Sequence, residues 1–406
     1  MLEYLKEYFD YRGLLICLGL VGVGLLSVYS ATYDVGAAAA FEKQLVWAGL
    51  GLLALVVAAF FPLKTLQRIS LPLYIGTIGI LLVILVIGHT VAGSKSWFGV
   101  AKGFGGQPSE FAKVTTVLAL SAFLARTSIS LSNPKHLMLA VGVVAIPMLL
   151  VLAEPDLGTS VVFFLMMLPV LYWAGASNFV LAAILAPIIA AAGALLGTLA
   201  LLVSLVVSGS LLYVARQNRF AAAVAFALTL AVGLSVQAVY ERLPAYQQKR
   251  ISTFLNPASE QKGAGYNVYQ SKVAIGSGGF LGKGYLQGTQ TQLNFIPEQW
   301  TDFIFCVPGE EFGFVGASIV IGLFTGLLLH GVNVAGASKN KFASAASIGI
   351  TAVFGVHVLI NIGMSMGLLP VIGIPLPFLS YGGSALVANM AMVGLLMNFY
   401  SNRKEH

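Results

Sequence analysis

The residues best suited to chemistry lie in a polar, glycine-rich segment, residues 270–313, of a chain that is otherwise strongly apolar. Asp302 stands near the end of that segment, directly before an apolar run. A carboxyl group at a water–lipid boundary is partly desolvated, and this raises its pKa toward the range useful for a general base. We therefore predict that Asp302 is a catalytic base, with a helix cap as the alternative. Glu310 and Glu311 follow closely and would either assist it or begin the next helix.

Ionisable residues also occur inside or beside apolar stretches, where each costs roughly a few kcal/mol and so suggests a function. Glu110 and Lys113 follow Pro108, a good first residue for a helix, and their spacing places both on one helix face. They form either a structural ion pair or a pair that lines a cavity. Asp156 lies in a tight turn before another apolar stretch, where it either caps the next helix or binds a polar substrate.

Three further patterns favour structural roles. The glycines from Gly276 to Gly284 lack the spacing of a dinucleotide fingerprint, so they form a flexible loop or a backbone N–H nest for an anionic headgroup. His357 and Asn361 are four residues apart, and we interpret them as a buried hydrogen-bonded pair between helices. The two cysteines and five histidines are scattered, which gives no disulfide framework and no dedicated zinc site.

The composition requires a membrane around the chain. Hydrophobic residues make up 58% and charged residues only 9%, whereas about a quarter of the residues are charged in soluble domains. The fold class is therefore an all-α polytopic membrane protein. We attribute the net charge of +7 to cytoplasmic loops and not to nucleic-acid binding. The first apolar stretch, after Arg12, is read as a retained span because more spans follow it.

About twelve transmembrane helices are predicted, because a helix needs about 20 apolar residues to cross a bilayer. They are expected at residues 11–32, 43–61, 70–92, 107–126, 136–154, 157–174, 178–196, 198–215, 220–240, 310–333, 344–367 and 383–400. Basic residues in short loops place both termini in the cytoplasm, and these are Lys6, Arg12, Lys64, Arg68, Arg126, Lys135, Arg216, Arg219, Lys339, Lys341, Arg403 and Lys404. Residues 241–309 then form a large extracellular loop that carries Asp302.

Several motifs together resemble the SEDS family of shape, elongation, division and sporulation proteins, which includes RodA, FtsW and SpoVE. The matching segments occur in family order, at residues 107–113, 154–160, 265–266, 270–279, 297–305 and 375–384. Residues 367–377 resemble RodA more than FtsW, in which a Thr-Lys pair typically follows the Leu-Pro. Such proteins usually have about ten spans, so residues 197–240 are expected to be an additional helical hairpin within a single membrane domain, residues 1–406.

The resemblance implies a peptidoglycan glycosyltransferase that polymerises lipid II during cell-wall elongation, in the bacterial cytoplasmic (inner) membrane. Asp302 would deprotonate the acceptor hydroxyl, and cations would meet the departing pyrophosphate. The residues expected to bind substrate are Glu110, Lys113, Asp156, Arg250, Lys272, Gln292, Thr301 and Ser380. A divalent cation, Mg or Mn, is expected without assigned ligands, and no organic cofactor. The expected partners are lipid II, a class B penicillin-binding protein transpeptidase and other membrane proteins of the elongation complex.

Three alternatives remain open at the level of sequence. A lipid II flippase would spread its charged residues through the membrane, whereas here they gather toward the outer face. A division or sporulation role would keep the same chemistry. A scaffold that only recruits a synthase would leave Asp302 without a purpose.

Overall fold

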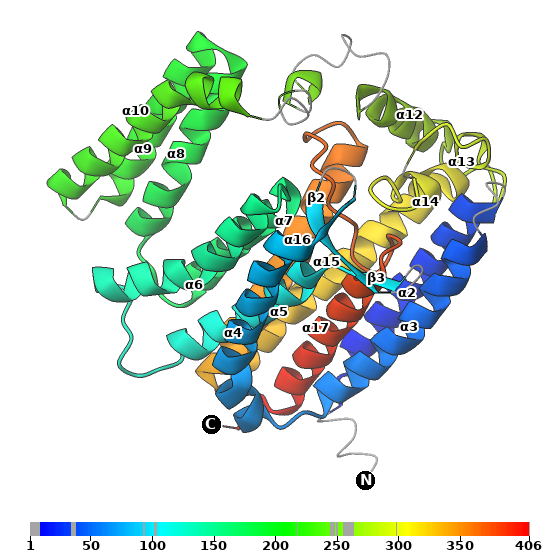
Figure 1. Ribbon diagram of the computed structural model, residues 1–406, viewed down its shortest axis with the longest axis horizontal. Coiled ribbons are helices and arrows are strands. Elements are labelled where there is room, and N and C mark those ends of the chain that lie inside the picture. The colour runs from blue at the N-terminus through cyan, green and yellow to red at the C-terminus, as the bar shows by residue number, and fades with distance from the viewer. Residues whose placement is uncertain are drawn as a thin grey trace. The chain divides into compact units, whose positions relative to one another are not determined.

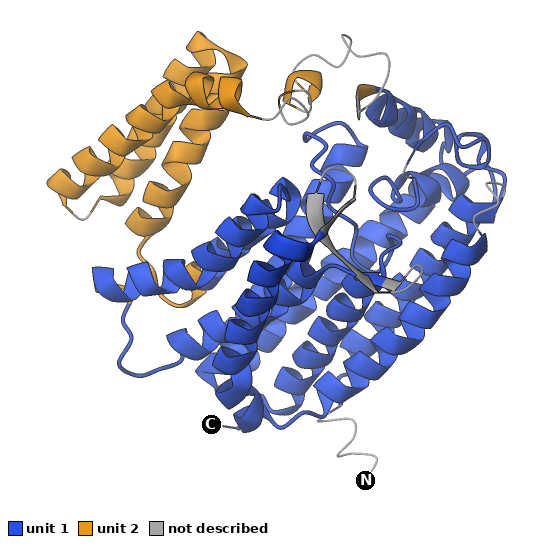
Figure 2. Ribbon diagram, in the orientation of Figure 1, with its two compact units in different colours: residues 1–130, 134–170, 266–406 blue, residues 131–133, 171–265 orange. Residues whose placement is uncertain are grey.

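The computed structural model describes most of the chain as helices (Figure 1). The described residues are 9–33, 38–91, 94–100, 104–216, 218–243, 248, 251–254, 264–297 and 299–405. Two compact units are present (Figure 2). The first comprises residues 1–130, 134–170 and 266–406, and the second comprises residues 131–133 and 171–265.

Every predicted span is a helix, as expected for apolar segments whose backbone must satisfy its own hydrogen bonds in lipid. The spans are α2 (Tyr11–Tyr33), α3 (Ala38–Ala59), α4 (Leu63–Ile87), α5 (Pro108–Leu124), α6 (Pro134–Ala153), α7 (Leu157–Trp173), α8 (Asn178–Leu196), α9 (Thr198–Ala215), α10 (Arg219–Arg242), α15 (Gly313–Ala337), α16 (Lys341–Ser365) and α17 (Gly383–Ser401). Among the described residues, 10 of these helices are long and apolar enough to cross a membrane, and the two others, α5 and α7, are shorter at 17 residues each. The all-α polytopic fold is thus confirmed.

The region between α4 and α5 differs from the prediction. The helix ends at Ile87, before an extended Gly88, and not at residue 92. Three short antiparallel strands follow in the order β1 (His89–Val91), β2 (Ser94–Val100) and β3 (Phe104–Gly106). Counting apolar residues missed this sheet, because a hydropathy count does not register that an extended glycine ends the helix.

The large loop before α15 is built from short helices. They are α12 (Ala264–Ser277), α13 (Thr289–Gln292) and α14 (Cys306–Glu311). The span predicted to begin at residue 310 begins at Gly313, whose φ of 63° is a left-handed value that suits glycine. A sharp turn therefore separates α14 from α15.

The most buried spans of the first unit are α16 and α17, whose apolar windows are 67% and 72% buried. Helices α5 and α15 pack against α16, and α3 packs closely against α17. A Cβ on Gly394 would lie 2.2 Å from the carbonyl oxygen of Leu55, so glycine lets the backbones of α17 and α3 touch. Polar side chains on α16 must consequently find their hydrogen-bond partners within the protein.

Candidate active site

The backbone around Asp302 is fixed by hydrogen bonds from two other segments. Tyr381 N, Ser380 Oγ and Asn361 Nδ2 donate to three consecutive carbonyl oxygens of residues 300–302, at 2.8, 2.6 and 2.9 Å. Asp302 itself is only half-buried. The predicted base is therefore held through the main chain of its segment, and the residue is partly exposed.

Ser380 and Thr301, both predicted to bind substrate, meet each other in this arrangement. The Ser380 hydroxyl donates to Thr301 O and accepts from Leu376 N at 2.8 Å. Ser380 is buried, with 5% of its surface exposed. The Ser380 hydroxyl therefore helps to position the backbone directly before Asp302.

His357 and Asn361 lie one turn apart on α16 and are both buried, as predicted. Asn361 Nδ2 donates to Ile374 O at 2.8 Å in addition to Asp302 O. His357 Nδ1 lies 3.0 Å from Pro375 O. The two side chains do not pair with each other but hold the loop that carries Ser380.

Glu110 and Lys113 form an ion pair of 2.9 Å on the buried face of α5. Lys113 is 0% exposed and Glu110 is 3% exposed. Lys113 Nζ also lies 2.9 Å from His357 Nε2, so the pair braces α5 against α16. Neither side chain presents surface to a substrate in this arrangement, which favours the structural alternative.

Asp156 caps α7. Its Oδ1 accepts from Thr159 N at 3.0 Å, and its Oδ2 accepts from Gln107 Nε2 at 2.8 Å. The starts of α5 and α7 are therefore tied together, and Pro108 opens α5 as predicted. In the adjoining turn, burial and then the charge of Asp156 raise the pKa of Glu154 to about 8.

Glu310 anchors the loop that precedes α15. Its carboxylate accepts from Lys283 Nζ at 2.7 Å and from the backbone N of Gln290 and Thr291 at 2.9 and 3.0 Å. Burial acts to raise the pKa of Glu310, but these hydrogen bonds outweigh it and the pKa is lowered. The neighbouring Glu311 accepts a hydrogen bond from Ser30 on α2.

Gln292, predicted to bind substrate, belongs to the same anchoring contacts, since its Nε2 donates to Ser30 Oγ at 3.0 Å.

The glycine run packs against α14. A Cβ on Gly278 or Gly282 would lie 2.2 or 2.1 Å from carbonyl oxygens of that helix. The backbone N–H groups of Lys283 and Gly284 donate to Glu310 O and Glu311 O. Close backbone packing, rather than a nest for an anion, thus explains the run.

Lys272 and Arg250 are the two remaining basic residues that were predicted to bind substrate. Lys272 is exposed on α12, beside Gly367. Ser271 Oγ donates to Ser365 O at 2.9 Å and fixes this part of α12 at the end of α16. Arg250 lies outside the described residues.

Sequence reasoning missed two buried glutamines. Gln44 on α3 donates to Ser380 O and accepts from Gly382 N, both at 3.3 Å. Gln299 Nε2 donates to Ala31 O and Thr291 O, both at 3.0 Å. An amide inside an apolar span, such as Gln44, is the signal that would have found the first of them.

No group of three or more His, Cys, Asp and Glu side chains that could hold a metal ion occurs within the part of the chain that the structure describes. The described donors therefore do not form a complete metal cage. Mg²⁺ is often held by one or two carboxylates together with substrate phosphates, an arrangement that needs no such cage.

An apolar groove of about 740 Å³ runs along α4 and the start of α5. Its lining residues are Gly76, Thr77, Gly79, Ile80, Val83, Gly106, Pro108 and Phe111. The groove reaches the first turn of α5, which also carries Glu110.

These features define a multi-pass membrane protein with a half-buried carboxylate, Asp302, in a loop whose backbone is fixed by hydrogen bonds. The cell cycle protein family that comprises FtsW, RodA and SpoVE matches residues 7–207 and 196–405. The chain belongs to this family.

The chain is 35% identical over 402 residues to the peptidoglycan glycosyltransferase MrdB of Escherichia coli K12, covering 98% of this chain and 95% of that protein. It is 34% identical over 427 residues to the peptidoglycan glycosyltransferase RodA of Treponema pallidum, covering 96% and 97% of the two chains. A solved peptidoglycan synthase complex, described as coordinating polymerization and crosslinking, contains a chain of similar fold, with a TM-score of 0.74 and 27% identity over 98% of this chain and 99% of that one.

Proposed function

We propose that this chain is a peptidoglycan glycosyltransferase that polymerises lipid II into glycan strands during cell-wall elongation. The similarity to MrdB and RodA along nearly the whole chain supports this function. The structural observation that carries it is the half-buried Asp302, which ends a segment, residues 300–302, whose backbone carbonyl groups accept hydrogen bonds from α16 and from residues 380–381.

In the proposed reaction the Asp302 carboxylate accepts the proton of the 4-hydroxyl group of the acceptor sugar. The freed oxygen attacks the anomeric carbon of the donor with inversion. One glycosidic C–O bond forms, the C–O bond to the lipid diphosphate breaks, and the diphosphate leaves with the electron pair. A general base must lie within hydrogen-bond reach of the proton that it accepts. The hydrogen bonds to the backbone around Asp302 would help to keep its carboxylate at that distance from the acceptor hydroxyl.

The negative charge on the leaving diphosphate needs a cation. Lys113 is buried against Glu110, so the described residue that suits this role is the exposed Lys272. A divalent cation is proposed to arrive with the diphosphate, because Mg²⁺ binds readily to substrate phosphates. No step is assigned to a metal resident in the protein.

The groove beside α4 and α5 suits a polyprenyl tail. Its wall is apolar, and it begins beside the first turn of α5. A lipid chain in this groove would place its diphosphate near the outer end of α5, where Gln107 and Asp156 lie.

The setting of the enzyme is also part of the proposal. Basic loops place both termini in the cytoplasm and the large loop outside the bacterial inner membrane. A class B penicillin-binding protein is the proposed transpeptidase partner, alongside other elongation proteins. The similar chain in a complex that couples polymerization with crosslinking supports such a pairing.

A gel assay tests this function directly. Purified full-length protein is incubated in detergent with lipid II and Mg²⁺, beside Asp302→Asn and the control Glu42→Gln, which changes an exposed carboxylate on α3. Wild type and Glu42→Gln are expected to give glycan ladders, and Asp302→Asn none. Full activity of Asp302→Asn would remove the assignment, and no ladder from any sample, even with the partner synthase added, would favour lipid transport.

A further inference from the structure

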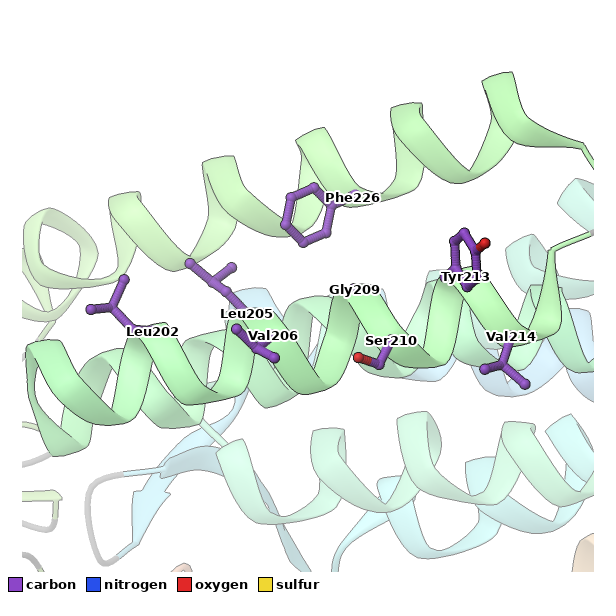
Figure 3. Close-up of a pocket in the computed structure, with 8 residues that line it drawn as sticks. All are labelled: Leu202, Leu205, Val206, Gly209, Ser210, Tyr213, Val214 and Phe226. Atoms are coloured by element: carbon purple, nitrogen blue, oxygen red, sulfur yellow. The ribbon is translucent and has the colours of Figure 1, made fainter.

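The second unit contains an open groove between α9 and α10. Both helices pack more extensively against α8 than against each other, and a furrow lies between them (Figure 3). Two cavities of about 580 and 540 Å³ share Gly209, Tyr213 and Phe226, so they form one continuous groove.

The greater part of the groove is apolar. Leu202 and Val206 on α9 are 61% and 69% exposed. Phe226 extends from α10 toward α9 (Figure 3), and a Cβ on Gly209 would lie 3.1 Å from its ring. Gly209 therefore lets the Phe226 ring lie close to the backbone of α9 at the middle of the groove.

One end of the groove is strongly basic. Arg216 and Arg219 line it at the turn that joins α9 to α10. The Arg216 guanidinium lies 3.3 Å from the centre of the Tyr213 ring and donates to Tyr213 O at 3.1 Å, which holds it at the groove. None of the lining residues is acidic.

These features match an anionic lipid better than a protein helix. From Leu202 to Ala215, the residue before Arg216, α9 rises about 20 Å at about 1.5 Å per residue, enough to cover the roughly 15 Å of one leaflet. Basic pockets between transmembrane helices on the cytoplasmic side bind anionic headgroups. Small residues such as Gly209, Ala222 and Ala223 also line the groove, but the two arginines at its end favour an anionic headgroup over an apolar partner helix.

We propose that the α9–α10 groove binds an anionic diacyl phospholipid of the inner leaflet, with an acyl chain along α9 and α10 and the phosphate between Arg216 and Arg219. The leaflet follows from the orientation given under Proposed function; the site itself does not depend on the glycosyltransferase reaction.

The test measures lipid retention by the purified full-length protein. Phosphatidylglycerol and phosphatidylcholine of equal chain length are added in detergent, and bound lipid is counted by native mass spectrometry. The variants are Arg216→Gln/Arg219→Gln, Val206→Trp to fill the groove, and the control Lys339→Gln/Lys341→Gln, which removes two exposed charges from another loop on the same predicted side.

Wild type and the lysine control are expected to retain phosphatidylglycerol in preference to phosphatidylcholine. The arginine variant should lose about tenfold to thirtyfold of that retention, as two juxtamembrane basic charges predict. Val206→Trp should lose retention while keeping both arginines. Equal retention of the two lipids by wild type would overturn the proposal.

Two other outcomes would also overturn the site. If the lysine control lost as much phosphatidylglycerol as the arginine variant, or if Val206→Trp retained it undiminished, the retention would come from general surface charge and not from the groove. A second polypeptide that crosslinks to the groove and displaces the phospholipid would assign the groove to a partner helix. Because lipid II and glycan products are not part of this readout, its failure would leave the proposed polymerase function untouched.

Discussion

Breaking the buried ion pair on α5 should show strong coupling between its two members. In Lys113→Met, the Glu110 carboxylate stays in a site where it is 3% exposed and loses its partner at 2.9 Å. Removing one member of a buried pair costs about 3–5 kcal/mol, because the other charge is left uncompensated. The lost contact with His357 should add about 1 kcal/mol. Glu110→Gln should destabilise the protein by a similar amount, because the buried Lys113 ammonium then loses its carboxylate partner.

The double variant Glu110→Gln/Lys113→Met leaves no buried charge. Since replacing a whole buried pair by neutral groups is often nearly neutral, we expect a loss of about 1–2 kcal/mol. The two single losses together come to about 7–11 kcal/mol, so the coupling free energy should be at least about 5 kcal/mol.

Equilibrium unfolding of the four proteins in mixed detergent micelles measures this cycle. Additive losses, with a coupling below about 0.5 kcal/mol, would refute the idea that the pair acts as a buried brace. Single variants that are stable but inactive would instead return Lys113 to the substrate-binding role expected from its sequence motif.

Three further predictions concern the cap of α7, the buried Glu154 and the divalent cation. Asp156→Asn should keep the α7 cap, whereas Asp156→Ala should cost about 1 kcal/mol of unfolding free energy in the same unfolding assay; equal losses in both would contradict the capping role. The pKa of Glu154 is raised from 4.5 to about 8, so the folded state binds an extra proton between these values, and stability should fall as the pH rises from about 5 to about 8. Glu154→Gln should flatten that pH profile, and an unchanged profile would mean that another group causes the pH dependence of stability. Chelation should stop polymerisation and added Mg²⁺ should restore it, while calorimetry of the protein without lipid II should detect only weak Mg²⁺ binding; tight binding by the protein alone would point to a cage that includes residues other than the described ones.

Hydropathy predicted the helical membrane fold well, because an apolar segment in lipid must satisfy its own backbone hydrogen bonds and therefore forms a helix. Spacing along one helix also worked: Glu110 and Lys113 were expected on one face and form an ion pair there. The strands after Gly88 were missed because they depend on local pairing in a short polar region. A count of apolar residues does not detect hydrogen-bonded pairing between strands.

The contacts around Asp302 illustrate what one sequence leaves out. The motif pointed to Asp302, Thr301 and Ser380, but it gave the last two to the substrate. The structure shows Ser380 donating to Thr301 O, with Asn361 holding the adjacent carbonyl. These bonds join segments about 60 and 80 residues apart, since the pairs span 59 and 79 positions. Only the packed fold brings these segments together, so local patterns could not predict these contacts.

The most direct test of the central claim separates chemistry from binding at Asp302. The rate of a single glycosyl transfer and the equilibrium binding of lipid II are measured for wild type and Asp302→Asn, with Glu42→Gln as the control. A general base contributes about 10²–10⁴-fold, so Asp302→Asn should lose at least about 100-fold in rate while its affinity for lipid II changes by less than about threefold. A rate close to wild type, or a loss that is fully explained by weaker lipid II binding, would contradict the account.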